Sequence, residues 1–458
     1  MPKPSIPQGT RDFSAMVVRK RHYIFSVIKK VFELYGFEPL ETPAMENLET
    51  LIGKYGEEGD KLIFKILNNG LNREEKTGKA RAGFEQILSG KNSSDVTERA
   101  LKYDLTIPFA RYVSMNHSKL IFPFRRYQLQ PVWRADKPQR GRYREFTQCD
   151  ADVVGSTSLL NEVELANIYH EVFIRLGFIN YELRINSRKI LAALAELCGG
   201  SDKMMDITIS IDKLDKIGLD KVTEELQQRG LNESQVAIID HYLAITGSNQ
   251  EKLSAVGSLL GLSANAAKGI EELKYVTDLA KNTNIIIDLT LARGLNYYTG
   301  MIFEAKAPKE INMGSIGGGG RYDDLTGLFG VPGIPGVGIS FGVDRIYDVM
   351  DELNLFPEAL QVGSKALFFN MGEKESAFAF DIMQQMRSKG VACELYHEEA
   401  KIAKQFSYAE KKNIPFVVII GSREMVENSC QVKNLATGEQ HTLLLEKLAE
   451  FLTPNNGY

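Results

Sequence analysis

The stretch FPFRRYQLQPVWRADKPQRGRYREFTQCDAD, residues 122–152, decides how the rest of the chain is interpreted. Over 124–144 it holds six arginines and one lysine against a single acid, Asp136. Hydrophobic and polar residues alternate over 127–133, a turn rich in proline, glycine and charge follows, and a second run spans 143–154. The stretch therefore predicts a β-hairpin that carries a local concentration of positive charge.

The arginines of this hairpin indicate which ligands it would bind. Their planar guanidinium groups match pairs of phosphate oxygens, which the point charge of a lysine does not. The single tryptophan of the chain, Trp133, directly precedes Arg134 and is predicted to pack beneath it. From these residues alone, two interpretations stand side by side: a phosphate-binding active site, and a basic hairpin that binds nucleic acid through its surface.

Length and composition limit the class of protein. The chain has 458 residues, which predicts two or three domains, and its 43% hydrophobic and 25% charged residues are typical of a globular protein. The net charge is −4, so a nucleic acid would meet local basic patches and not a global positive field. No apolar run has membrane-spanning length and no signal peptide is evident, so we expect a cytoplasmic protein with no membrane partner. The cysteines are predicted to be buried thiols and the histidines are dispersed, so no metal site is predicted. The cysteines are Cys149, Cys198, Cys393 and Cys430.

The N-terminal part predicts a helix followed by an edge strand. Apolar residues fall on one face over 19–35, and Gly36 follows as a C-terminal cap would. The segment 37–43 contains two prolines, which restricts it to the edge of a sheet. Residues 68–98 are polar and rich in glycine and charge, which predicts a partly mobile insertion.

Two short segments predict a small polar cup. The run 101–111 has a strand pattern that places Asp104 and Thr106 on one face, where both can accept hydrogen bonds from an ammonium group. The alternative for this run is a half-exposed strand with a polar face. Gln148 and Asp152 lie four residues apart on the second hairpin strand and share a face.

Residues 186–284 predict an inserted helical domain without catalytic residues. Asn186 and Ser187 are placed to cap a helix that runs to Leu197 before two glycines. Further helices are predicted over 220–229, 233–245 and 264–281.

Specific patterns return after residue 284. A buried strand is predicted over 285–289, and the run 302–305 follows it. Four glycines at 317–320 allow either a close approach of the backbone to a ligand or a flexible turn, and they are no P-loop because no GxxxxGK[ST] follows. Residues 336–345 predict a strand that leads into a helix, with Arg345 in its first turns.

The C-terminal segment, from about Ser364, predicts a small α/β layer with a mainly parallel sheet. Strands are predicted over 365–371, 391–396 and 416–420. The helix between the first two has one apolar face, formed by Phe378, Ile382 and Met386.

Several of these motifs resemble those of class II aminoacyl-tRNA synthetases. The hairpin, with its core at 133–136, resembles motif 2; the helix and edge strand resemble motif 1; and 336–345 resembles motif 3. The runs RGLNYYTG, 293–300, and GGGGRYDDL, 317–325, resemble the histidine-specific motifs of the histidyl-tRNA synthetases. QGTRDF and LKYDLTIPFAR fit the same family, so the resemblance covers nearly the whole chain.

The resemblance implies an α+β catalytic core, with a mainly antiparallel sheet flanked by helices, a helical insertion and a small C-terminal α/β domain. The implied boundaries are 1–185 for the first part of the catalytic domain, 186–284 for the insertion, 285–356 for the second part of the catalytic domain and 364–458 for the anticodon-binding domain.

The resemblance also implies a role for individual residues. Histidine would be bound by Asp104, Leu105, Thr106, Arg134, Gln148, Asp152, Arg293, Tyr297 and Tyr298. ATP, as its Mg²⁺ complex, would be bound by Arg134, Asp136, Arg142, Arg144, Phe146 and Arg345. The catalytic residues would be Arg134, Arg293 and Arg345, and the acceptor end of the tRNA would meet Lys137 and Gln139. The chain departs from the family at Asn296, where many members have aspartate, which removes a charge from that position.

These expectations define a homodimeric histidine–tRNA ligase that acts on L-histidine, ATP and tRNA(His). The alternative is a regulatory paralogue that binds histidine without charging tRNA, which is expected to lack the C-terminal domain and part of the arginine set. Both are present here. A synthetase for proline, threonine or glycine is a third interpretation, against which the run RGLNYYTG argues.

Overall fold

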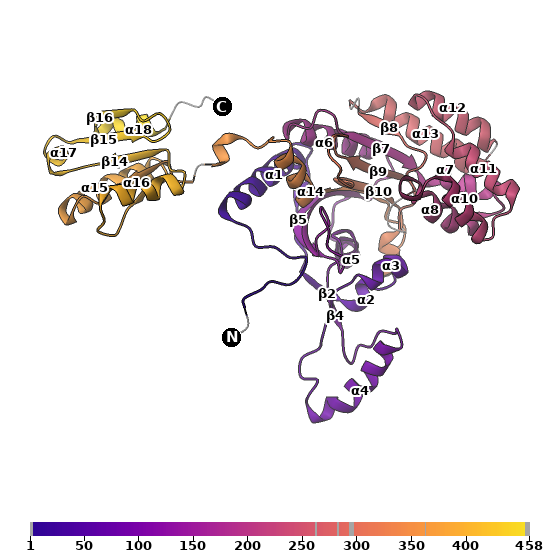
Figure 1. Ribbon diagram of the computed structural model, residues 1–458. Helices are drawn as coiled ribbons and strands as arrows, with labels where there is room; N and C mark the ends of the chain where they lie inside the picture. Colours follow the sequence, from indigo (N-terminus) through magenta and orange to yellow (C-terminus); the bar gives the residue numbers. More distant parts are fainter. Residues whose placement is uncertain (1–2, 262, 282–283, 293–296, 362, 454–458) are drawn as a thin grey trace. The chain divides into compact units, whose positions relative to one another are not determined.

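A computed structural model describes residues 3–261, 263–281, 284–292, 297–361 and 363–453 of the chain. The chain divides into two compact units, Met1–Leu355 and Phe356–Tyr458, and each is described by itself. The larger unit is built on an eight-stranded sheet with the order β1-β5-β6-β11-β10-β9-β7-β8 (Figure 1). Its strands are β1 (Glu38–Pro39), β5 (Phe124–Trp133), β6 (Glu145–Val154), β7 (Glu182–Ser187), β8 (Ile285–Ile287), β9 (Met301–Lys306), β10 (Gly317–Tyr322) and β11 (Gly336–Gly342).

The directions of these strands confirm the predicted fold class. β1–β5 and β7–β8 pair in parallel, and the other neighbours in the order are antiparallel. The arginine-rich stretch forms the predicted hairpin, in which Phe124 lies opposite Val154 and Trp133 lies opposite Glu145. The edge strand predicted around two prolines is β1, at one end of the sheet.

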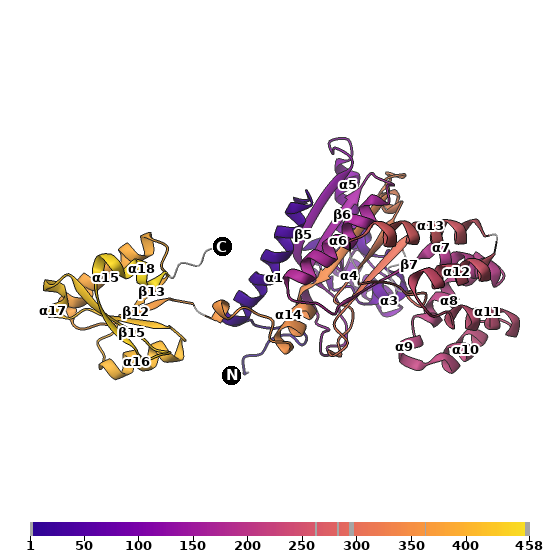
Figure 2. The same ribbon diagram turned by 90° about the horizontal axis from the view of Figure 1, so that it is seen from above.

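Helices cover one face of the sheet and leave the other for a site. The covering helices are α1 (Ala15–Leu34), α6 (Leu160–Arg175) and α14 (Val343–Glu352), which pack on one another and on β6 and β11 (Figure 2). Phe341 of β11 lies at the centre of an aromatic cluster, with its ring centroid 5.9 Å from Phe32, 4.8 Å from Tyr169 and 5.5 Å from Phe173. Because side chains alternate along a strand, this cluster places the neighbouring residues of β11 on the open face.

The glycine run is a strand, so the interpretation as a flexible turn is wrong. β10 lies in the middle of the sheet between β9 and β11. The glycines are required by close approach, since a Cβ on Gly319 would lie 2.2 Å from the carbonyl oxygen of Gly338 on β11. Sequence patterns of β-propensity do not reveal such a strand, because glycine is depleted in most strands.

The run 101–111 is also not the predicted strand. β4 (Arg99–Leu101) ends at its start, and α5 (Thr106–Asn116) occupies its second half. The carboxylate of Asp104 accepts a hydrogen bond of 3.1 Å from the backbone N–H of Ile107, which satisfies a donor at the start of the helix. Pro108 is compatible with the first helical turn, where its missing N–H costs nothing.

The polar insertion contains a regular helix that the sequence did not predict, α4 (Glu74–Leu88), which in the view of Figure 1 lies below a small sheet and apart from its strands. This sheet has the order β2-β4-β3, with β2 (Met45–Asn47) and β3 (Lys65–Ile66). A Cβ on Gly83 would lie 2.6 Å from Ser93 Oγ, so the helix packs closely on the segment that follows it. Its short apolar side, which includes the small residues Ala80 and Gly83, gives little periodic signal.

The predicted helices between β7 and β8 are present, and the predicted cap is confirmed. The Ser187 hydroxyl accepts a hydrogen bond of 3.3 Å from the backbone N–H of Lys189 at the start of α7. The sequence missed α8, α9 and α12, although α12 begins with a capping box formed by Ser248 and Glu251. The helices of this segment are α7 (Arg188–Leu197), α8 (Met204–Ile211), α9 (Leu214–Ile217), α10 (Leu219–Gln228), α11 (Glu233–Leu243), α12 (Asn249–Leu260) and α13 (Ala264–Leu279).

The smaller unit has a mixed sheet, which corrects the predicted mainly parallel one. Its order is β13-β12-β14-β15-β16; the pairs among β13, β12 and β14 are parallel and those among β14, β15 and β16 are antiparallel. The predicted apolar helix face packs on the sheet from α15. Its elements are β12 (Ala366–Phe368), α15 (Glu373–Ser388), β13 (Cys393–Leu395), α16 (Ile402–Lys411), β14 (Phe416–Ile419), α17 (Ser422–Val426), β15 (Ser429–Asn434), β16 (Gln440–Leu444) and α18 (Leu448–Leu452).

The four cysteines are free and buried, as predicted. Within the ranges that the structure describes, no helix has the length and apolar character needed to span a membrane.

Candidate active site

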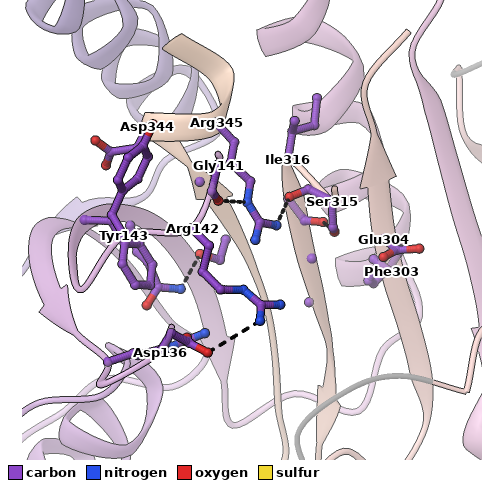
Figure 3. Close-up of a pocket in the computed structure, with 18 of the residues that line it drawn as sticks. Asp136, Gly141, Arg142, Tyr143, Phe303, Glu304, Ser315, Ile316, Asp344 and Arg345 are labelled. Atoms are coloured by element: carbon purple, nitrogen blue, oxygen red, sulfur yellow. Dashed lines mark hydrogen bonds and ion pairs between the residues drawn. The ribbon is translucent and has the colours of Figure 1, made fainter. Parts of the chain in front are cut away.

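A cavity of about 400 Å³ opens on the face of the sheet that the helices leave free (Figure 3). Its wall comes from the hairpin, from β9, β10 and β11, and from the start of α14. The structure brings together here seven of the residues predicted from the sequence: Arg134, Asp136, Arg142, Phe146, Gln148, Tyr298 and Arg345.

Three arginines make one side of this cavity strongly positive. Arg345 is fixed by hydrogen bonds of 2.6 Å each, from Nε to the carbonyl oxygen of Gly141 and from Nη1 to that of Ser315 (Figure 3). Arg142 lies 3.6 Å from the Asp136 carboxylate. Burial lowers the pKa of Arg345, and the nearby charges of Arg142 and Arg134 lower it further. The guanidinium groups therefore repel one another, and a bound anion would relieve this repulsion.

Arg134 is held by aromatic rings, but not by the predicted one. Its Nε donates a hydrogen bond of 3.1 Å to the carbonyl oxygen of Tyr103, and its guanidinium carbon lies 4.2 Å from the centre of the Tyr103 ring and 5.2 Å from that of Phe146. The prediction that Trp133 packs beneath it is wrong, because successive side chains at the end of a strand point to opposite faces.

Asp344 connects three parts of the chain at the edge of the cavity. It accepts hydrogen bonds from Arg21 of α1 at 2.6 Å and from the backbone N–H of Thr147 at 2.9 Å, and it also pairs with Arg11. This carboxylate lies in the first turn of α14, next to Arg345, and fixes that turn against the hairpin. Asp344 was not predicted as a site residue, although its position directly before Arg345 pointed to it.

A buried ionic cluster adjoins the part of the cavity wall that contains Ser340 and Tyr298. Three carboxylates, Asp104, Asp150 and Asp152, are each 2% exposed, and the Arg126 guanidinium among them is fully buried. Arg126 Nη2 lies 2.8 Å from Asp152 Oδ2, and Tyr322 donates its hydroxyl to the same carboxylate. Burial raises the pKa of Asp152, while Arg126 opposes that rise.

Asp104 is fully engaged in this cluster and does not line the cavity. Besides its bond from the start of α5, it accepts hydrogen bonds from the hydroxyls of Tyr55 at 3.0 Å and Tyr297 at 3.2 Å. Burial raises the pKa of Asp104, and these donors together with the charge of Arg134 oppose the rise.

Asp150 was not predicted as a site residue. It lies opposite Gln128 on β5 and opposite Ser340 on β11. Burial and, more weakly, the charge of Asp152 raise the pKa of Asp150 to about 7, although Arg126 opposes the rise. The available signal was its position on β6, midway between two predicted site residues on the same face.

The wall above the cluster is polar. Gln148 Nε2 donates a hydrogen bond of 2.9 Å to Ser340 Oγ, and both residues face the cavity. Glu304 of β9 also lies in the wall and is 6% exposed (Figure 3). The ring of Tyr298 lies over Gly320, where an added Cβ would be 2.8 Å from Tyr298 Cδ1. Sequence reasoning missed Glu304 and Ser340, because a single acid or hydroxyl in a strand carries no pattern.

The remaining predicted residues that the structure describes lie outside the wall of the cavity. Arg144 donates to the backbone carbonyls of Asp136 and Gln8 and so braces the hairpin loop, on which Lys137 and Gln139 are exposed. Tyr297 packs edge-on against the ring of Tyr298. Leu105 and Thr106 lie at the start of α5, and Arg293 and Asn296 fall outside the described residues. Among the side chains that the structure describes, no group of three or more potential metal ligands is assembled.

The mainly antiparallel sheet with an arginine-lined cavity on its open face is the arrangement expected of a class II aminoacyl-tRNA synthetase. The family model for histidyl-tRNA synthetase matches residues 82–346, and the model for the anticodon binding domain matches residues 365–455. The chain therefore belongs to the histidyl-tRNA synthetase family, as the sequence motifs predicted.

Individual relatives agree with this assignment over nearly the whole chain. A histidine–tRNA ligase of Bacteroides fragilis (strain YCH46) is 52% identical, over 98% of this chain and 99% of the relative. One of Flavobacterium johnsoniae is 50% identical, with the same coverage. The crystal structure of histidyl-tRNA synthetase from Nostoc sp. PCC 7120 is 32% identical, covers 98% of both chains and gives a TM-score of 0.81.

Proposed function

We propose that this chain is a histidine–tRNA ligase. It activates L-histidine with ATP to histidyl-adenylate and pyrophosphate, and then transfers the histidyl group to the 3′ end of tRNA(His). The observation that carries the proposal is the polarity of one cavity, whose wall holds three arginines and, at Ser340 and Tyr298, adjoins three buried carboxylates. An amino acid placed between them would direct its carboxylate toward the arginines and its ammonium group toward the acids.

The arginine side is proposed to bind ATP as its Mg²⁺ complex. Arg134 would hold the α-phosphate and the substrate carboxylate, Arg142 and Arg345 would hold the terminal phosphates, and the ring of Phe146 would stack on adenine. Asp136 and Arg144 would keep the hairpin loop in position. Arg293 would bridge carboxylate and α-phosphate, a role that rests on its place in the run RGLNYYTG.

The acidic side is proposed to select histidine. The ammonium group would be bound, directly or through Tyr297, by Asp104, Leu105, Thr106 and Gln148. The Tyr297 hydroxyl donates a hydrogen bond to Asp104. Asp152 and Tyr298 would meet the imidazole. A neutral imidazole has one N–H donor and one bare nitrogen acceptor, so it satisfies a carboxylate and a hydroxyl together. A side chain that lacks these groups would leave both partners unpaired.

Chemistry in this site would depend on positioning and on charge. Fixed guanidinium groups stabilise the negative charge that develops on the phosphates, without a covalent enzyme intermediate. In the second step, the exposed Lys137 and Gln139 on the hairpin loop would meet the acceptor end of the tRNA, and the unit that contains 364–458 would read the anticodon. A cytoplasmic location follows from this role in protein synthesis.

We also propose a homodimer that forms along β1 and α1. β1 pairs with β5 on one side, and no other described strand pairs with its second side. Apolar side chains are exposed nearby in the sequence, with Leu34 at 67% and Met45 at 51%. An unpaired edge next to apolar side chains favours a second copy, and sedimentation velocity would measure the mass.

ATP–pyrophosphate exchange with each amino acid in turn tests the proposed function. Histidine should support exchange, and the other amino acids should support little. The regulatory alternative predicts histidine binding without exchange. It is not favoured, because the arginine set and the C-terminal unit are present and curated histidine–tRNA ligases match nearly the full length.

A further inference from the structure

The buried cluster beneath the cavity carries more negative than positive charge. Asp104, Asp150 and Asp152 are nearly inaccessible to solvent, and Arg126 is the guanidinium that lies among them. Ionised carboxylates without a compensating partner are costly away from water. The empty cavity therefore favours a proton on one of the three acids, and each has a raised pKa in which burial is the largest cause.

Hydrogen bonding indicates which acid holds that proton. Asp104 and Asp152 both accept hydrogen bonds from tyrosine hydroxyls. In this cluster, the buried carboxylate oxygens without a hydrogen-bond partner among the described residues are Asp150 Oδ1 and Asp152 Oδ2, but Asp152 Oδ2 is paired with Arg126 Nη2 at 2.8 Å. Oε1 of Gln128 is also buried without a hydrogen-bond partner.

Asp150 and Gln128 are directly opposed on neighbouring antiparallel strands, so their side chains lie on the same face of the sheet. Two acceptors cannot satisfy one another. A carboxyl group that is protonated becomes a donor, and a proton on Asp150 would give the Gln128 carbonyl its missing partner.

We propose that Asp150 holds a proton while the cavity is empty and releases it when the ammonium group of the amino acid enters. The added positive charge lets the third carboxylate ionise, and its proton passes to solvent. Each amino acid that binds would thus release at most one proton from Asp150. The inference rests on the proposed function, because it takes the ligand to be an amino-acid cation.

Asp150 is a positioning residue, since it reaches the ligand through its neighbours. The hydroxyl of Ser340 hydrogen-bonds to it and favours its ionised form. The same hydroxyl oxygen accepts the hydrogen bond from Gln148 in the cavity wall. A change in the charge of Asp150 therefore acts on the two side chains that face the ammonium group.

Other charged groups near Asp150 also influence its protonation. They are Arg126 on β5, Asp152 on β6, and Asp104 and Lys102 in the segment before α5. Burial lowers the pKa of Lys102 to about 8, so this residue stays mostly charged at neutral pH. The ring of Tyr298 faces all three acids, which raise its pKa further above the range of the experiment.

Isothermal titration calorimetry of the full chain with L-histidine tests the coupling. Titrations in two buffers with different ionisation enthalpies, repeated from pH 5.5 to 8.5, give the number of protons released on binding. With a pKa of about 7, Asp150 should contribute about half a proton at pH 7 and less at pH 8.5. Free histidine in solution has the same protonation state in the wild-type and variant titrations. The difference in proton release between wild type and Asp150→Asn therefore isolates the Asp150 carboxyl group.

The expected result is that Asp150→Asn releases about half a proton fewer than wild type at pH 7. Asp206→Asn, which removes a carboxylate from the partly exposed pair with Arg229, should release as many protons as wild type. Equal release by wild type and Asp150→Asn would overturn the proposal.

A second variant decides the matter if Asp150→Asn does not fold. Ser340→Ala removes the hydroxyl that favours the ionised acid, so the pH range of proton release should move upward; an unchanged range would overturn the proposal. Absence of histidine-dependent pyrophosphate exchange in wild type would instead contradict the proposed function, and the two failures are therefore distinguishable.

Discussion

Replacing Asp152 by alanine should weaken both the fold of the larger unit and its selection of histidine. The substitution removes the ion-pair partner of the fully buried Arg126, 2.8 Å away, and the acceptor of the Tyr322 hydroxyl. Removal of one partner of a buried pair costs about 3–5 kcal/mol, since the other charge stays buried without compensation. The remaining acids, Asp104 and Asp150, offset part of this cost, which places the expected loss near the lower end of that range.

The single tryptophan provides the assay. Trp133 lies at the end of β5, so its fluorescence during urea unfolding follows the larger unit and not the C-terminal one. Asp278→Ala is the matched control, because it breaks an exposed pair with Lys274 on α13 and should cost less than about 0.5 kcal/mol. A loss below about 1 kcal/mol for Asp152→Ala would refute the account of a critical buried pair.

Steady-state kinetics distinguish a role of Asp152 in histidine recognition from a purely structural role beside Arg126. If Asp152 also meets the imidazole, Asp152→Ala raises the KM for histidine and lowers discrimination against other amino acids, while the KM for ATP changes little. If the residue only braces Arg126, both KM values rise together in a less stable protein. The first pattern is the predicted one.

Further changes test other parts of the site. Arg345→Ala should slow pyrophosphate exchange about tenfold to a hundredfold, because a charge-assisted bond to phosphate contributes about 1.5–3 kcal/mol. Initial rates of exchange would measure this. Gly338→Ala should lower the melting temperature, since its Cβ would lie 2.0 Å from a buried carboxylate oxygen, whereas at Gly318 the nearest atom is 3.5 Å away and the same change should be tolerated. Deletion of 364–458 should preserve some histidine-dependent exchange and abolish most tRNA charging, and equal charging by the shortened protein would contradict the role of the last unit. Because the pKa of Asp150 is raised in the fold from 3.8 to about 7, the stability that its proton contributes is lost as pH rises between these two values, so the melting temperature of Asp150→Asn should fall less than that of wild type between pH 5 and 7.

The sequence predicted the elements with strong local signals. The hairpin has clear alternation and a turn, the helix before Gly36 has one apolar face, and Arg345 follows a strand that ends in glycine; each was found where expected. Some of the predicted site residues on the hairpin converge with Arg345 of α14 on one cavity, because β6 and β11 are neighbours in the sheet. These hairpin residues are Arg134, Asp136, Arg142, Phe146 and Gln148.

The errors arose where tertiary contacts decide the structure. The glycines at 317–320 form a strand because the backbone of β11 approaches too closely for side chains. The run 101–111 alternates over a few residues, but a carboxylate cap turns it into a helix. Ser340 and Glu304 could not be predicted, because their importance depends on register between strands that are distant in sequence.

Charging of tRNA(His) with radiolabelled histidine is the direct test of whether this chain is a histidine–tRNA ligase. The full-length protein, supplied with ATP and Mg²⁺, should transfer histidine to tRNA(His), and the reaction should stop when either histidine or ATP is left out. Arg134→Ala should lose this activity, while Asp278→Ala, which changes an exposed side chain that does not line the cavity, should keep it. Tight binding of histidine without any charged tRNA would contradict the account.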